Sequence, residues 1–105
     1  MSTPAAYKFK LYDLGALKRL LNPVAAFWVA IADQLGMGSH VHAIRGTSSN
    51  TNPPECLRDL LIRWIDQGHS TLEVLCQSLR DDPEIIGGAE VANKLEKEFQ
   101  NRRGY

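Results

Sequence analysis

The sequence predicts an all-α fold, a six-helix antiparallel bundle, and three observations support this prediction. Apolar residues recur at spacings of three and four through most of the chain, as they do on a helix that buries one face. No stretch of five or more residues alternates apolar and polar side chains, as a half-buried strand does. Glycine, proline and capping residues interrupt the apolar stripes. Such amphipathic helices must bury their stripes against one another.

The chain is predicted to form one domain, because its 105 residues match the common domain size of about 100–150 residues. Residues 1–10 contain Pro4 and show no stable period, so we expect a flexible N-terminal tail there. Residues 11–100 are expected to be the folded domain, and residues 101–105 a polar C-terminal tail.

The charge balance argues against several classes of protein. Twelve basic and 12 acidic residues leave no net charge, whereas bulk nucleic-acid or membrane-surface binding needs a basic field. The longest apolar run, Val24 to Ala32, has nine residues, and a membrane-spanning helix needs about 20. Two cysteines and the lack of a visible signal peptide favour a reducing compartment. We therefore expect a cytoplasmic protein without membrane insertion.

Three helices are predicted in the first half of the chain, at about Asp13–Leu21, Val24–Leu35 and Ser39–Arg45. The dipeptide Asn22-Pro23 is expected to separate the first two, because the residue before proline is disfavoured in the helical region. Gly36 and Gly46 are expected to end the second and third, since glycine readily takes the left-handed conformation.

Three more helices are predicted in the second half, one between Asn52 and Gly68, one from Ser70 to the break at Asp82-Pro83, and one between about Gly88 and Gln100. Asn52 is expected to cap the first of these. Ser70 and Glu73 have the spacing of a capping box. Trp28 and Trp64 lie on apolar stripes and are expected in the core.

No arrangement of side chains predicts catalysis or metal binding. His40 and His42 are the one close pair of metal-ligand types, but side chains two residues apart on a helix point in different directions. Cys56 is expected in the first turn of a helix, which can lower a thiol pKa. A thiolate nucleophile also needs a positioned histidine, and His69 is at the far end of that helix. We expect no enzyme activity, no catalytic residue, no metal and no cofactor.

A helical nucleic-acid-binding or transcription-associated domain is the alternative. The two helices joined around Gly68 have the order of a helix-turn-helix. The second of them is expected to expose Glu73, Gln77, Ser78 and Arg80, which is a poor set for reading base edges.

Several segments resemble the death-domain family. The segment from Phe27 to Gly36 is similar to the W-x-x-L-A-x-x-L-G pattern of its second helix, with Ile31 in place of the first leucine. The segments that resemble its third to sixth helices are Val41 to Ile44, Cys56 to Trp64, Gly68 to Leu79, and Val91 to Leu95. The resemblance runs from about Leu14 to Phe99. The start of the chain resembles the N-terminal death domains of interleukin-receptor-associated kinases.

The resemblance implies a module that docks homotypically or heterotypically with other death domains and assembles signalling complexes in apoptosis or innate immunity. It implies neither enzyme activity nor a cofactor. Carried onto this sequence, the docking faces of the family include Asp33, Gln34, Arg45, Arg58, Arg63, Asp66, Gln67, His69, Asp81 and Asp82. The residues themselves suggest how such docking works, because basic and acidic side chains fall on different predicted corners, and charge complementarity sets register and partner choice.

Overall fold

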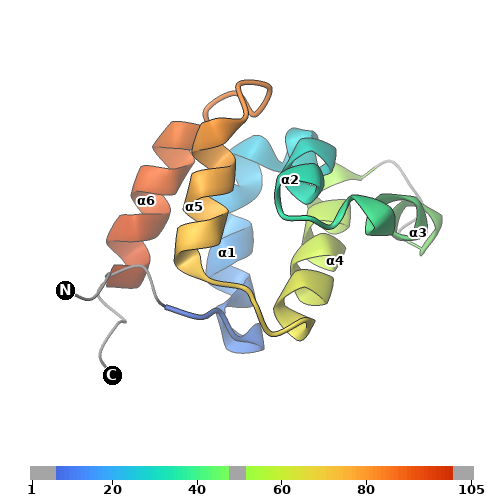
Figure 1. The fold of residues 1–105 in the computed structure, drawn as a ribbon, viewed down its shortest axis with the longest axis horizontal. Coiled ribbons are helices and arrows are strands. Elements are labelled where there is room, and N and C mark those ends of the chain that lie inside the picture. The colour runs from blue at the N-terminus through green and yellow to red at the C-terminus, as the bar shows by residue number, and fades with distance from the viewer. Residues whose placement is uncertain (1–6, 48–51, 101–105) are drawn as a thin grey trace.

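The computed structural model describes residues 7–47 and 52–100, and the fold of these residues is all-α, as predicted (Figure 1). The α-helices are α1 (Leu14–Leu21), α2 (Trp28–Gln34), α3 (Val41–Thr47), α4 (Pro53–Asp66), α5 (Leu72–Asp81) and α6 (Gly88–Gln100). Short 3-10 segments, labelled η, occupy Leu11–Asp13 (η2), Asn22–Phe27 (η3) and Gly38–His40 (η4). Helices α5 and α6 lie side by side, while α1 contacts both α4 and α6.

The prediction of a break at Asn22-Pro23 is wrong. Asn22 keeps helical dihedral angles, with φ −52° and ψ −40°, and η3 continues directly from α1 into α2. Pro23 is the second residue of this 3-10 segment, where its missing N–H costs little because the first donors of such a segment have no partner within it. With the unbroken stretch counted as one, the described residues contain five helices instead of six separate ones.

This unbroken stretch, Leu11–Gln34, has 24 residues and is long and apolar enough, by length and composition alone, to cross a membrane. Some of its apolar side chains face the protein interior, where Leu17, Leu21 and Ile31 are fully buried in the core, whereas Leu11 is 59% exposed. Lys18 and Arg19 lie exposed on the same stretch. Packing against the other helices therefore accounts for the apolar residues on the buried side of this stretch.

The N-terminal tail ends earlier than predicted. Residues 7–10 belong to the folded domain, because Phe9 is only 1% exposed. The Phe9 N–H donates to the Ser70 carbonyl over 2.7 Å, and the Leu72 N–H donates to the Tyr7 carbonyl over 2.8 Å. The remaining parts of the two predicted tails, residues 1–6 and 101–105, lie outside the described residues.

A buried aromatic cluster joins this segment to the helices. The Phe9 ring centroid lies 5.1 Å from that of Phe99 in α6 and 5.9 Å from that of Trp64 in α4. The two tryptophans are in the core as predicted, with Trp28 6% and Trp64 2% exposed. The core therefore includes three residues from outside the predicted helices: Phe9, Met37 and Ile85.

The predicted helix ends are partly confirmed. The Asn52 side chain caps α4 by accepting from the Glu55 N–H, and Gly36 and Gly68 have the left-handed φ values of 76° and 86°. Gly46 does not end α3, which continues to Thr47.

The predicted capping box at Ser70 is also wrong. The cap of α5 is Thr71, whose hydroxyl accepts from the Val74 N–H over 3.3 Å. Ser70 is fully buried, and its hydroxyl donates to the Phe9 carbonyl over 3.5 Å. Ser70, which the local pattern assigned to the cap of α5, therefore bonds to the N-terminal segment instead.

We expect Trp64→Ala to lower the free energy of unfolding by about 3–5 kcal/mol, because it leaves a cavity in a packed core. Chemical denaturation followed by circular dichroism measures this loss. His42→Ala is the control, since His42 is exposed and its truncation should leave the unfolding midpoint unchanged. Equal stability of the two variants would place Trp64 outside the core.

Phe9→Ala should also cost about 3–5 kcal/mol, since a buried phenylalanine is removed from an aromatic cluster. Leu11→Ala is the matched control, because Leu11 is two residues away and 59% exposed. Urea titration of both variants gives the comparison. If residues 7–10 were a flexible tail, the unfolding midpoints of both variants would equal that of the wild type.

Candidate docking surface

Three of the predicted docking residues, Gln34, Asp81 and Asp82, lie together where the end of α2 meets the end of α5, and Asp33 precedes Gln34 with its carboxylate beside Gly38. We call these four residues the acidic corner. The Gln34 side-chain amide donates to the Asp82 carboxylate over 3.5 Å. The Asp81 carboxylate accepts from the Gln77 amide over 2.8 Å. None of the three carboxylates forms a salt bridge with another described residue.

A shallow groove of about 360 Å³ adjoins the acidic corner, between the end of α2 and the exposed side of α5. Its lining includes Glu73, Gln77 and Val74, and Val74 is 41% exposed. Sequence reasoning missed this groove. The available signal was Val74 itself, an apolar residue off the buried stripe of its helix.

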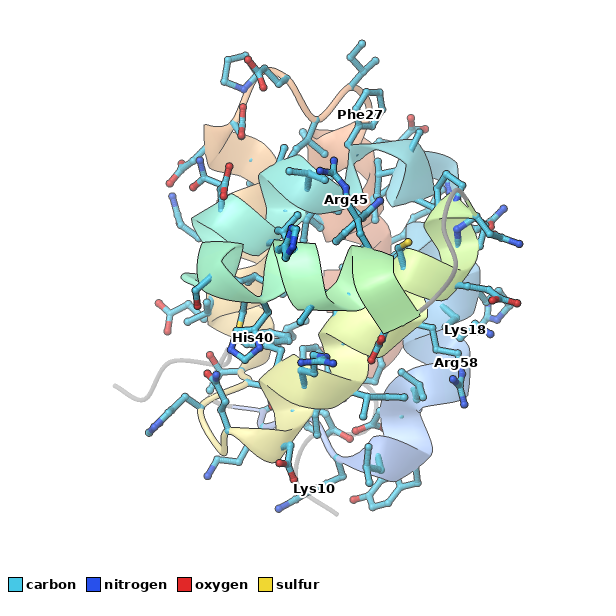
Figure 2. All side chains as sticks on the ribbon, turned by 90° about the vertical axis from the view of Figure 1, so that its right-hand side faces the viewer. Lys10, Lys18, Phe27, His40, Arg45 and Arg58 are labelled. Carbon is cyan, nitrogen blue, oxygen red and sulfur yellow. The ribbon has the colours of Figure 1, made fainter. Side chains whose placement is uncertain are left out.

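Three exposed cations lie on another side of the molecule, which we call the basic face: Lys18 of α1, Arg45 of α3 and Arg58 of α4 (Figure 2). None of them forms a salt bridge within the described part of the chain. The Arg45 guanidinium carbon lies 5.8 Å from the centroid of the Trp28 ring, an arrangement that holds a cation in place while leaving its charge free. The basic face is therefore available for an acidic partner.

Arg63, which was also predicted for docking, is engaged inside the fold. Its guanidinium pairs with Asp59 one helical turn earlier, over 3.3 Å, in the favoured order with the acidic residue nearer the N-terminus. Its Nη1 also lies 3.5 Å from Nδ1 of His40. Arg63 therefore ties α4 to the end of η4 and is less available than Arg58.

The remaining predicted residues, Asp66, Gln67 and His69, are exposed around the turn at Gly68. This turn precedes α5, whereas Asp81 ends the same helix. A ten-residue helix is about 15 Å long, so this turn and the acidic corner are separate surfaces.

Both cysteines are buried, and burial raises their thiol pKa values. The helix N-terminus does not lower the pKa of Cys56, because desolvation by burial raises it. Burial raises the pKa of Cys76 to about 12, and its thiol donates to the Ala92 carbonyl over 3.6 Å. Both thiols are thus protonated near neutral pH. Among the described residues no group of three or more metal-ligating side chains is placed to hold a metal ion.

Two of the side chains predicted to face outward from α5, Ser78 and Arg80, form hydrogen bonds within the fold. Ser78 is 5% exposed, contrary to prediction, and its hydroxyl donates to the Val74 carbonyl over 2.8 Å. Arg80 donates to both carboxylate oxygens of Glu96, over 2.9 and 2.8 Å, and to the Asn93 side-chain oxygen. These contacts attach α5 to α6 and leave little on α5 for reading base edges.

Comparisons of the chain with protein-family models, with curated proteins and with solved structures find no match.

The Arg80–Glu96 pair predicts a small pH dependence of stability. The hydrogen bond from Arg80 holds the pKa of the Glu96 carboxyl below its ordinary value, so the pair stabilises the fold above the unfolded glutamate pKa of about 4.3. This contribution is lost as the pH falls through the lower pKa of the folded state. Because both side chains are about one third exposed, it amounts to less than about 1 kcal/mol.

Glu96→Gln should therefore lower the unfolding free energy slightly at pH 7 and have less effect at pH 3. Urea titrations at both pH values measure the difference. Glu84→Gln is the control in the preceding turn, since Glu84 is exposed and forms no salt bridge with a described residue. A loss of unfolding free energy for Glu96→Gln that is equal at both pH values would contradict the stabilising role assigned to the Arg80–Glu96 pair.

Proposed function

We propose that the chain is a death-domain-like interaction module that docks with like-folded domains and so assembles a signalling complex. The observation that carries the proposal is the separation of unpaired charge between the basic face and the acidic corner. Opposite charges on different surfaces of one chain allow one copy to bind the next in register.

The arrangement of the helices supports the family proposed. If the chain folds like a death domain, the tryptophan-bearing stretch at Trp28 corresponds to the second helix of a six-helix antiparallel bundle. The short α3 and the long α4 then follow in the order that the resemblance implies. The chain bends through η3, so α1 and α2 run in different directions although no loop separates them.

The proposed mechanism is multivalent docking. Exposed charge pairs are individually weak, about 0–1 kcal/mol, so a single patch gives little affinity. Several patches used at once raise the effective concentration of each contact and give a stable assembly. The partners are death domains of this chain or of other proteins, in signalling of the apoptosis or innate-immunity type in the cytoplasm. No catalytic group or cofactor takes part in this mechanism.

The order of contact is also part of the proposal. Complementary charges speed the encounter between the basic face of one copy and the acidic corner of another. Residues without an internal salt bridge, such as Arg58 and Lys18, form these contacts without first breaking one inside the fold.

Arg58→Glu should weaken self-association, measured by sedimentation velocity over a concentration series, while the unfolding midpoint stays at the wild-type value. Arg58 is exposed and has no salt bridge with a described residue, so only docking loses a contact. Lys8→Glu makes the same change in net charge at an exposed residue outside both surfaces and serves as the control.

A mixture of Arg58→Glu and Asp33→Arg chains should recover association, because each reversed charge then meets its opposite. Association that is unchanged by Arg58→Glu would contradict the basic face. A wild-type chain that stays monomeric at about millimolar concentration would contradict homotypic docking.

A further inference from the structure

The turn between α5 and α6, residues 82–87, holds an apolar side chain out from the surface. Ile86 is 71% exposed, one of few large apolar residues in the described chain with so much exposure. Three carboxylates precede it in the sequence, Asp81, Asp82 and Glu84, and none has a salt-bridge partner among the residues described; Glu84 is the one outside the acidic corner. This turn therefore presents one aliphatic group with an acidic margin.

The turn is rigid. Ile85 is 3% exposed and anchors it in the core. The Glu84 N–H donates to the Asp82 carboxylate over 2.9 Å, and the Gly88 N–H donates to the Ile85 carbonyl over 2.9 Å. Gly88 packs so closely on α5 that an added Cβ would collide with the Leu79 carbonyl oxygen. A turn whose backbone is held in this way loses little conformational entropy on binding.

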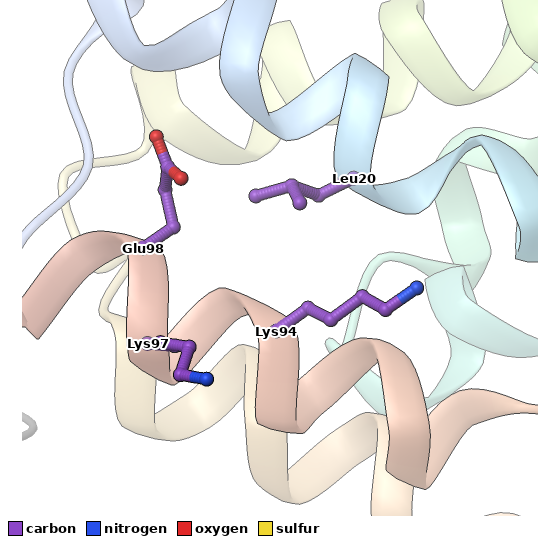
Figure 3. Close-up of a pocket in the computed structure, with 4 residues that line it drawn as sticks. All are labelled: Leu20, Lys94, Lys97 and Glu98. Atoms are coloured by element: carbon purple, nitrogen blue, oxygen red, sulfur yellow. The ribbon is translucent and has the colours of Figure 1, made fainter.

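A groove of about 360 Å³ lies between α1 and α6 and has the complementary chemistry. Leu20 extends from α1 toward the α6 residues Lys94, Lys97 and Glu98 (Figure 3). Glu98 is paired with Arg19 over 3.5 Å. Neither lysine forms a salt bridge with any residue in the described ranges. The groove therefore has an apolar centre and a net positive margin.

We infer that the α5–α6 turn of one copy docks into the α1–α6 groove of a second copy. Ile86 packs on Leu20, and the Glu84 carboxylate faces Lys94 and Lys97, which leaves Asp81 and Asp82 to the acidic corner. The apolar contact excludes water, and the opposite charges orient the turn in the groove. The inference rests on the proposed function, because it takes the partner to be a like-folded chain, and it adds a second contact to that partner.

The groove of the same chain is out of reach of the turn. The turn leads directly into α6 at Gly88, and Lys94 and Lys97 follow on the same rigid helix, about 9 and 13 Å further along its axis. Only another copy can bring the turn to the groove.

The turn and the groove are different surfaces, so the contact is head-to-tail. Each added copy leaves one turn and one groove unoccupied, and the assembly grows beyond a dimer unless it closes into a ring. The contact is also small compared with the roughly 1,600 Å² of a standard stable interface. It therefore acts together with the basic face and the acidic corner.

Sedimentation velocity over a concentration series tests the inference. The wild-type mass should rise past the dimer, and both Ile86→Ser and the double variant Lys94→Glu/Lys97→Glu should weaken association roughly tenfold or more, which corresponds to about 1.4 kcal/mol. An equimolar mixture of the two variants should associate more than either alone, since one retains the groove and the other the turn.

Matched controls separate docking from folding. Leu11→Ser removes another exposed apolar side chain, and Lys8→Glu reverses another exposed lysine; both lie away from the turn and the groove. All of these substitutions are at exposed positions, so the unfolding midpoints should stay near the wild-type value. The controls should associate like the wild type.

The outcomes distinguish the two proposals. Association that is lost in Arg58→Glu but unchanged in Ile86→Ser and in the double lysine variant would overturn the turn-and-groove contact and leave the proposed function standing. The reverse pattern would support the contact and contradict the basic face. An effect of Ile86→Ser without an effect of the lysine variant would assign the turn to another partner and overturn the inference, as would a monomeric wild-type chain.

Discussion

The packing of Phe9 against Trp64 and Phe99 is the interaction on which the rest of the structure depends. These three rings come from the N-terminal segment, α4 and α6, and the Phe9 centroid lies 5.9 Å from that of Trp64 and 5.1 Å from that of Phe99. Two backbone hydrogen bonds beside them join the same segment to the residues that start α5. The buried Asp13 carboxylate accepts from the Tyr7 hydroxyl over 2.9 Å and from the Lys10 N–H over 3.0 Å, which fixes the segment to η2. The cluster therefore fixes the positions of α4, α5 and α6 relative to one another.

The surfaces of the molecule follow from this arrangement, because it decides which charges find partners inside the fold. Arg80 is used to attach α5 to α6, and Arg63 is used within α4. Arg58 and the carboxylates at the end of α5 are left without salt bridges to the described residues. A charge that is already paired must exchange one partner for another on binding, whereas an unpaired one gains a contact outright. Docking surfaces are therefore best sought among the charges that the fold has not used.

Rigid presentation links the fold to the proposed assembly. The turn that carries Ile86 is held by Ile85 in the core and by the close contact at Gly88, so its shape is set before any partner arrives. Arg45 is similarly held beside the Trp28 ring. Weak contacts between such preorganised groups add up efficiently, since little entropy is lost at each one. The charged contacts are screened by salt over about 8–10 Å under physiological conditions, which makes an assembly of this kind sensitive to ionic strength.

The sequence by itself determined the helical class, most helix ends and the burial of both tryptophans, because a 3.6-residue apolar period and a cap such as Asn52 act within a few neighbouring residues. The tertiary structure alone decided that Phe9 belongs to the core, that Thr71 and not Ser70 caps α5, and which predicted docking residues remain unpaired. Those outcomes depend on partners that are distant in sequence. A local pattern shows which side of a helix is apolar, but only the packed chain shows which polar side chain meets another element and which remains for a partner.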